Sequence, residues 1–236
     1  MFPHAERIPV DTHLSVHYDL ILKHIGPLLT PERRQKIDRV VAGRNFESAV
    51  VLESIYDRGN VSAVMRTAEG LGFANFHVIE TQEKFKESQR VTQGADKWVE
   101  TQKWKKTGDC IKALKDQGYR ICVTTLEAAK PLAEIDFSGK TALVLGNEKT
   151  GVSNEMLAAA DERMIIPMPG FVQSFNISVA GALCLYHIMI DRIRRRGSNA
   201  DLTSQEQEIL KALYYMRTQD SSVDYLKEMF SRGTLA

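Results

Sequence analysis

The apolar residues of this chain alternate between short continuous runs and helical repeats over most of its length. Apolar runs of about four to eight residues, bounded by turn residues, are typical of buried strands. Such runs cover residues 48–54, 76–80, 119–126, 141–146 and 163–168. Segments with helical spacing lie between them, at residues 60–71, 107–117 and 152–161. Strands that alternate with helices predict an α/β fold with a mostly parallel sheet covered on both faces.

Further helices are predicted on both sides of this alternating region. Before it, residues 12–28 have a weak helical pattern, and a stronger helix is predicted with Thr30 as its N-cap and Gly43 as its stop. The longest predicted helix runs from Asn176 to Arg196. Two helices are predicted after it, one from a capping box of Thr203 with Glu206 to Arg217 and one over residues 221–232. The polar stretch 81–105 has no clear period and predicts a long loop with a short helix.

The composition permits one α/β domain with helical additions, since 43% of the 236 residues are hydrophobic. A net charge of only +1 makes no case for a nucleic-acid partner. The positive charge is nevertheless concentrated: residues 31–44 hold five basic side chains against two acidic ones, and residues 191–196 hold four against one. These two segments indicate either a directed positive face or solvated helix ends, where arginine suits the helix dipole.

Other classes of protein are disfavoured by the sequence. Cys110, Cys122 and Cys184 lie far apart in apolar runs, which predicts reduced core cysteines. No stretch reaches the roughly 18 apolar residues of a membrane span. The N-terminus has no secretory apolar core, so we expect a cytoplasmic protein, or an organellar one whose transit peptide has been removed. His13 and His17 have helical spacing but no evident third ligand, so no metal is expected.

Two loops hold most of the candidate chemistry. The first, GNEKTGVS, begins at Gly146, and the second, PMPGFVQSFN, begins at Pro167; each follows a predicted strand and precedes a predicted helix. Open α/β sheets bind ligands at loops of this kind. The second loop adds three neutral hydrogen-bonding side chains, Gln173, Ser174 and Asn176. Without a catalytic cysteine, paired carboxylates or a phosphate-cradling lysine loop, the two loops predict a site that holds a neutral or zwitterionic cofactor through backbone groups.

The predicted helix over residues 60–71 carries two candidate functional residues. Its apolar stripe comprises Val61, Val64, Met65, Ala68 and Leu71. Arg66 falls off this stripe, so it is either an ordinary surface arginine or a functional group near the carboxyl edge of the sheet. Asn60 is expected to be the N-cap of the helix, and its amide could in addition position Arg66 or a substrate. Asn176 is the expected N-cap of the long helix.

Four segments keep a common order and spacing between about residues 31 and 197: NVSAVMRTAEGLG (60–72), TQGADKWVE (92–100), LVLGNEKTGVS (143–153) and IPMPGFVQSFNISVA (166–180). Together they resemble the motifs of the SPOUT methyltransferases, and most closely the tRNA guanosine-2′-O-methyltransferases of the TrmH group. The resemblance implies a SPOUT-type α/β fold, in which a parallel sheet ends in a C-terminal trefoil knot flanked by helical extensions. It also implies a homodimer and S-adenosylmethionine (SAM) held in the knot, with no metal and no membrane.

The resemblance also implies roles for individual residues. The implied catalytic group is Arg66, Asn60, Glu148, Ser174 and Asn176. Because a guanidinium with a pKa above about 12 is a poor base, we expect Arg66 to orient the phosphate and ribose and to stabilise a developing alkoxide; direct proton abstraction is the alternative. Main-chain groups around six positions are implied to surround SAM: Thr124, Gly146, Gly151, Ile166, Met168 and Phe175. The side chains expected to bind RNA are Arg33, Lys36, Arg44 and Arg192.

The implied function is SAM-dependent 2′-O-methylation of the D-loop guanosine of tRNA. The alternatives are an rRNA 2′-O-methyltransferase of the same superfamily and a catalytically silent RNA-binding dimer. The predicted division is an N-terminal helical extension that contacts RNA (1–46), the methyltransferase domain (47–197) and a C-terminal helical extension (198–236). The short first segment favours tRNA over rRNA. Trp98 and Trp104 are expected either to stack on bases or to pack within the protein.

Overall fold

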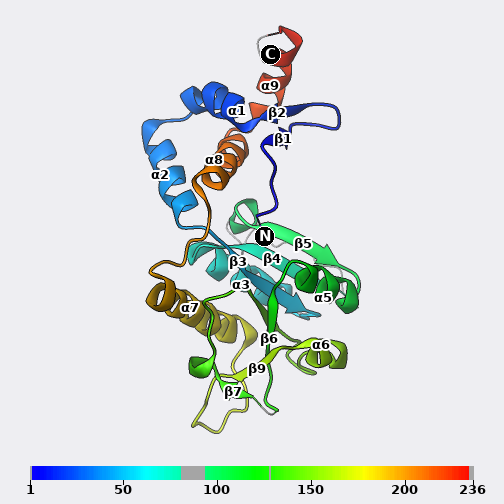
Figure 1. The fold of residues 1–236 in the computed structure, drawn as a ribbon. Coiled ribbons are helices and arrows are strands. Elements are labelled where there is room, and N and C mark those ends of the chain that lie inside the picture. The colour runs from blue at the N-terminus through cyan, green and yellow to red at the C-terminus, as the bar shows by residue number, and fades with distance from the viewer. Residues whose placement is uncertain (1, 81–93, 128, 234–236) are drawn as a thin grey trace. The chain divides into compact units, whose positions relative to one another are not determined.

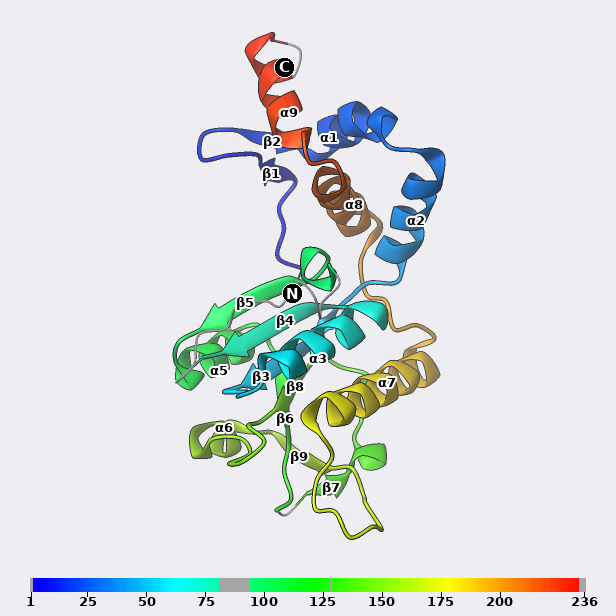
Figure 2. The same ribbon diagram turned by 180° about the vertical axis from the view of Figure 1, so that it is seen from behind.

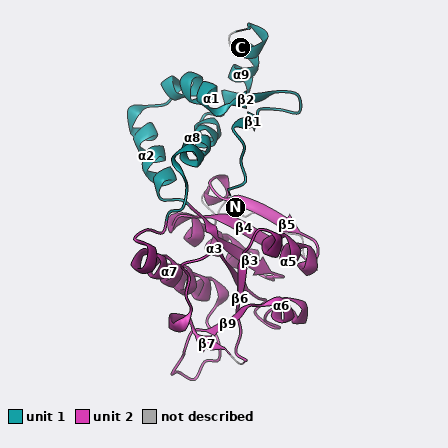
Figure 3. Cartoon of the chain, in the orientation of Figure 1, with its two compact units in different colours: residues 1–44, 200–236 teal, residues 45–199 magenta. Residues whose placement is uncertain are grey.

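The computed structural model describes residues 2–80, 94–127 and 129–233 of the chain. It divides into two compact units, Asn45–Asn199 and Met1–Arg44 together with Ala200–Ala236 (Figure 3). The larger unit therefore contains the alternating region of the sequence, and the smaller unit is formed by the segments on both sides of it.

A seven-stranded sheet forms the centre of the larger unit, and each pair of neighbouring strands in it is parallel (Figure 1). The strand order across the sheet is β5-β4-β3-β8-β6-β9-β7. The strands are β3 (Asn45–Glu53), β4 (Phe73–Ile79), β5 (Glu100–Trp104), β6 (Arg120–Thr124), β7 (Lys130–Pro131), β8 (Thr141–Leu145) and β9 (Glu162–Ile165). The predicted α/β fold with a parallel sheet is confirmed.

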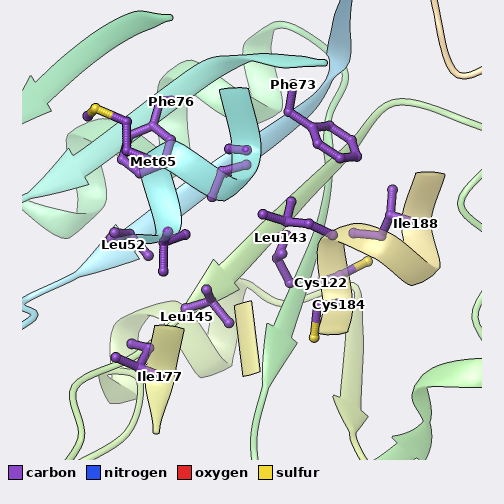
Figure 4. Close-up of a cluster of buried hydrophobic side chains, with 14 of the residues drawn as sticks. Leu52, Met65, Phe73, Phe76, Cys122, Leu143, Leu145, Ile177, Cys184 and Ile188 are labelled. Atoms are coloured by element: carbon purple, nitrogen blue, oxygen red, sulfur yellow. The ribbon is translucent and has the colours of Figure 1, made fainter. Parts of the chain in front are cut away.

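Helices cover both faces of this sheet (Figures 1 and 2). One face carries α3 (Arg58–Gly70) and α7 (Ile177–Arg196), and the other carries α5 (Thr107–Asp116) and α6 (Asn154–Ala159). Two short 3-10 helices, Ala95–Lys97 and Leu132–Glu134, lie in the connections. Because side chains alternate along a strand, β8 directs Leu143 and Leu145 to the α3–α7 face (Figure 4) and Val144 to the other.

The cysteines are part of these two cores, as predicted. Cys122 of β6 and Cys184 of α7 lie in the cluster between the sheet and the α3–α7 layer (Figure 4), and Cys110 lies in the cluster on the opposite face. All three are free and buried. Burial raises the pKa of each thiol to about 12, which keeps it protonated and unreactive.

The smaller unit contains a two-stranded antiparallel sheet, four α-helices and a 3-10 helix, Gly26–Leu28, among its described residues. The strands are β1 (Arg7–Pro9) and β2 (Ser15–His17), and the helices are α1 (Tyr18–Ile25), α2 (Pro31–Ala42), α8 (Ser204–Thr218) and α9 (Ser222–Ser231). Helix α8 packs against both α1 and α2. The predicted capping box is present: the Thr203 hydroxyl accepts a hydrogen bond from the Glu206 amide, while the Glu206 carboxylate accepts one from the Thr203 amide. Among the described helices, none is long and apolar enough to cross a membrane.

The prediction for residues 81–105 was wrong at its C-terminal end. Residues 100–104 form β5, which pairs in parallel with β4 at the edge of the sheet. An edge strand gains its hydrogen bonds from one neighbour and carries polar side chains, so ETQKW lacks the apolar run of a central strand. The remainder of this prediction, residues 81–93, lies outside the described residues. Residues 12–28 also differ from the prediction, since β2 precedes α1 within them.

Candidate active site

Three neighbouring strands bring predicted cofactor positions to one edge of the sheet. Strands β8, β6 and β9 are adjacent, and their carboxyl ends lead to Gly146, Thr124 and Ile166 respectively. The Thr124 hydroxyl donates a 3.1 Å hydrogen bond to the carbonyl of Val144, and the Thr125 amide donates a 3.0 Å bond to the carbonyl of Met164. The three strand ends are therefore held together where parallel sheets bind ligands.

The loop after β8 is a closed turn. The amide of Asn147 donates to the carbonyl of Gly151 at 2.9 Å, and the Gly151 amide returns a bond to the Asn147 carbonyl at 2.8 Å. Both glycines are required by the backbone: Gly151 has a φ of +69°, and a Cβ on Gly146 would lie 2.3 Å from the backbone of Gly151. These two hydrogen bonds close the turn, and the side chain of Glu148 is exposed on it.

A buried carboxylate holds the far end of this loop. Glu53, the last residue of β3, is 2% exposed. It accepts hydrogen bonds from the amide and hydroxyl of Ser153, at 2.8 and 2.7 Å, and from the hydroxyl of Thr107 at 2.7 Å. Ser153 is in turn the N-cap of α6. The sequence reading missed Glu53; the signal that could have identified it is a single charged residue at the end of an apolar strand.

Asn60 joins the first helix of the larger unit to both loops. Its amide nitrogen donates a 2.9 Å hydrogen bond to Oε1 of Glu148, and its amide oxygen accepts a 3.3 Å bond from Nδ2 of Asn176. These three predicted site residues come from α3, the loop after β8 and the start of α7. The contacts fix the relative positions of three segments that are far apart in the sequence.

The expected cap of α3 was wrong, whereas the cap of α7 is confirmed. Helix α3 starts at Arg58, and the side chain of Asp57 caps it by accepting a 2.7 Å hydrogen bond from the Gly59 amide. Asn60 lies within the first turn, so its amide is available to contact the loops. Asn176 does cap α7, because its Oδ1 accepts from the Ser178 amide at 2.8 Å.

Arg66 and Ser174 lie apart from these contacts. Arg66 is exposed on α3 and follows Asn60 by six residues, which turns it by about 240° around the helix. Within the described chain it makes no hydrogen bond or ion pair with Asn60, Glu148 or Asn176. The Asn60 amide thus holds Glu148 instead of Arg66. Ser174 is exposed in the loop before Asn176, together with Phe175, whereas Ile166 and Met168 are partly buried.

Of the four side chains predicted to bind RNA, Arg44 and Arg192 are buried, at 1% and 0% exposed. Arg192 donates to Glu47 at 2.9 Å and to the carbonyls of Phe137 and Gly139, both at 3.2 Å. The guanidinium of Arg44 lies over the ring of Tyr214, 5.6 Å from its centroid. Neither can meet a phosphate without leaving the core. Arg33 and Lys36 are exposed on α2, as expected.

The rest of the second basic segment is largely neutralised as well. Arg195 pairs with Asp191 at 2.8 Å, and Arg196 pairs with Glu47. Arg194, with its side chain 70% exposed, pairs with Asp191 only at 3.2 Å. The predicted positive face at the end of α7 is therefore mostly a set of ion pairs within the larger unit.

Trp104 packs within the protein. Its indole nitrogen donates a 3.0 Å hydrogen bond to Nδ1 of His77, and the two rings stack with centroids 6.0 Å apart. Burial lowers the pKa of His77 to about 4, so the imidazole is neutral and can accept this bond. Trp98 is partly buried, with the Lys97 ammonium 5.7 Å from its ring centroid.

Comparison with known proteins identifies a family and its relatives. The model of the SpoU rRNA methylase family matches residues 47–186. The chain is 38% identical over 201 residues to the tRNA (guanosine(18)-2′-O)-methyltransferase of Borreliella burgdorferi, covering 84% of this chain and 92% of that protein. The crystal structure of the TrmH/SpoU tRNA modifying enzyme of A. aeolicus superposes with a TM-score of 0.69 at 29% identity, covering 78% of this chain and 95% of that one. An AdoMet-bound rRNA methyltransferase from Sinorhizobium meliloti superposes with a TM-score of 0.58 at 25% identity, covering 65% of this chain and 59% of that one.

Proposed function

Because the chain belongs to the SpoU rRNA methylase family, we propose that it transfers a methyl group from SAM to a ribose 2′-hydroxyl of tRNA, at the D-loop guanosine. The named activity of the Borreliella burgdorferi relative supports this substrate, since the match covers most of both chains. The observation that carries the proposal is the pair of hydrogen bonds through which Asn60 joins Glu148 and Asn176. In the proposed reaction the target ribose lies between the two cofactor loops and helix α3. The two hydrogen bonds of Asn60 hold these segments together.

The residues at the sheet edge suit SAM. Thr124, Gly146 and Ile166 stand at the ends of three adjacent strands, and the further predicted positions Gly151, Met168 and Phe175 lie in the two loops. All six are uncharged, so they can surround a sulfonium without repelling it and can offer backbone groups to the adenosine and methionine parts. When bound, SAM supplies an electrophilic methyl group. No metal is needed for that chemistry.

Arg66 is proposed to act on the ribose. Its guanidinium stays protonated, so it can bind the adjacent phosphate and stabilise the alkoxide that develops at the 2′-oxygen. Ser174 has an exposed hydroxyl two residues before Asn176 and is proposed to hold the ribose or the reacting end of the cofactor. Asn60, Glu148 and Asn176 hold the two loops in fixed positions relative to α3. This arrangement aligns the ribose hydroxyl with the methyl group of SAM.

The active unit is proposed to be a homodimer formed through α7. Five apolar side chains at intervals of four and three residues are each 42–57% exposed along this helix: Val179, Leu183, Tyr186, Ile190 and Ile193. This spacing places them in one stripe, the pattern of a helix that packs against another helix. Arg66 lies away from Asn60 in its own chain, so in a dimer it would be available to the partner's site.

The finer architecture is also a proposal. We infer a trefoil knot between β8 and α7, supported by family membership and by the closed turn at Gly146. The division into residues 1–46, 47–197 and 198–236 assigns RNA contact to the first segment, where Arg33 and Lys36 are exposed on α2. No metal or membrane partner forms part of this account.

The test is methyl transfer from labelled SAM to purified transcripts. The proposal predicts incorporation of about one methyl group per tRNA and much less into rRNA fragments, without added divalent ion beyond that needed to fold the RNA. Exclusive methylation of rRNA would contradict the tRNA substrate. Tight RNA binding with no transfer to any RNA would favour a silent binding protein.

A further inference from the structure

Tyr56 is a large aromatic side chain that the core does not use. It lies in the connection between β3 and α3, four residues before Asn60, and is 67% exposed. Single exposed apolar residues are common and need no function by themselves. The position of Tyr56 beside the proposed reaction site, and the residue that contacts it, distinguish it from the other exposed aromatic side chains.

Three consecutive residues of the loop after β8 each contact the β3–α3 connection or the first turn of α3. Asn147 donates a 2.6 Å hydrogen bond to the carbonyl of Ser54, and Glu148 accepts the 2.9 Å bond from Asn60. Lys149 is the third: its ammonium lies 5.4 Å from the ring centroid of Tyr56. The first two contacts are strong and fix the two loops together. The third is a weak contact between two exposed side chains, and it holds an aromatic ring and a cation next to the Asn60–Glu148 bond.

We propose that Tyr56 and Lys149 bind the target nucleotide of the RNA: the ring of Tyr56 stacks on its base, and the ammonium of Lys149 binds its phosphate. The inference rests on the proposed function, because it places the 2′-hydroxyl near Asn60 and Glu148. The base is attached to the carbon next to the one that carries this hydroxyl, so it projects a few ångströms from the reacting atom. Tyr56 precedes Asn60 by four residues, and its neighbour Lys149 directly follows Glu148, so the ring and the ammonium are available to this base and its phosphate.

The chemistry of the pair suits an unpaired nucleotide. Proteins read unstacked RNA bases by stacking them on aromatic side chains, and lysine supplies a flexible point charge for phosphate. On binding, Lys149 exchanges an exposed, weak contact with the Tyr56 ring for a contact with a phosphate. The pair therefore determines how firmly the target nucleotide is held, while the two stronger contacts beside it keep their structural role.

The test compares enzyme variants on two RNAs. The variants are Tyr56→Ala, Tyr56→Phe and Lys149→Met, with Lys112→Met, an exposed lysine on α5, as the control. The RNAs are the tRNA substrate and the same tRNA with an abasic ribose at the target position. On the intact tRNA we expect Tyr56→Ala to lower kcat/KM by roughly tenfold or more, mainly through KM, and Tyr56→Phe to stay within about twofold. Lys149→Met should also raise KM, whereas Lys112→Met should not.

The abasic RNA isolates the stacking contact. On it, Tyr56→Ala and the unmodified enzyme should bind and react alike, because no base is present to stack. SAM affinity by calorimetry should be the same for all variants. An unchanged kcat/KM for Tyr56→Ala on intact tRNA, or an equal loss on both RNAs, would overturn the pair while leaving the proposed function in place. If the unmodified enzyme fails to methylate tRNA at all, the proposed function fails, and the pair with it.

Discussion

The amide of Asn60 donates a 2.9 Å hydrogen bond to the carboxylate of Glu148, 88 residues further along the chain. This bond links the start of α3 to the closed turn after β8, and the bond from Asn176 extends the link to α7. Side-chain hydrogen bonds thus join α3, the turn after β8 and the start of α7, which are far apart in the sequence.

Breaking this link should reduce catalysis more than stability. We expect Asn60→Ala to lower the rate of methyl transfer by at least about tenfold, because the bond orients two loops and a small misplacement of reacting groups is costly. Glu148→Gln should lose less than Glu148→Ala, since the glutamine oxygen still accepts the bond. In a double-mutant cycle the losses of Asn60→Ala and Glu148→Ala should be non-additive. Additive losses would mean that the two residues act separately.

Removing the buried carboxylate of Glu53 should destabilise the larger unit. Glu53→Ala leaves the hydroxyls of Thr107 and Ser153 and the Ser153 amide without their acceptor, at a cost of roughly 2–4 kcal/mol in the free energy of unfolding. Glu53→Gln should cost less. Urea unfolding measures both, and Glu155→Ala, at an exposed position on α6, is the control. A Glu53→Ala midpoint equal to that of the control would show that the carboxylate does not hold the loop.

The two basic segments should behave differently. Neutralising Arg33 and Lys36 together should weaken tRNA binding and flatten its salt dependence, because exposed cations on α2 release counterions from the RNA. Arg192→Met should instead lower the unfolding midpoint, since it removes the buried donor to Glu47 and to the carbonyls of Phe137 and Gly139. Fluorescence anisotropy over a salt series and urea unfolding separate these effects. A loss of RNA affinity in folded Arg192→Met would contradict the structural assignment.

Stability should fall as the pH drops below the ordinary range of histidine. Burial lowers the pKa of His77 from 6.5 to about 4, so between these values the unfolded chain binds a proton that the folded chain does not. The contribution of His77 to the free energy of unfolding is complete above pH 6.5. It is lost progressively as the pH falls from 6.5 to about 4. His77→Gln can keep the acceptor for Trp104 without titrating. Its unfolding free energy should depend less on pH across this window; an identical slope would exclude His77 as the cause.

Much of the fold follows from local pattern, but the site depends on distant contacts. Apolar runs predicted the central strands because those strands are buried on both faces, and β5 was missed because an edge strand is polar. Asn60 was read as a cap since side-chain capping is local, whereas its bonds to Glu148 and Asn176 arise only in the folded chain. Arg192 was predicted to bind RNA because its ion-pair partner, Glu47, lies 145 residues away in the sequence and cannot be identified from local pattern. The identity of the cofactor, SAM, was predicted from the resemblance to the SPOUT methyltransferases and not from the hydrophobic periodicity.

The most direct test of the account is to map ribose methylation on tRNA after reaction with the unmodified enzyme and with Arg66→Ala. The account predicts one 2′-O-methylated nucleotide, the D-loop guanosine, with the unmodified enzyme. With Arg66→Ala it predicts none, while SAM affinity stays within a few fold because the proposed role of Arg66 is to contact the RNA and not the cofactor. Near-normal methylation by Arg66→Ala, or a methyl group on a base instead of a ribose, would contradict the proposed chemistry.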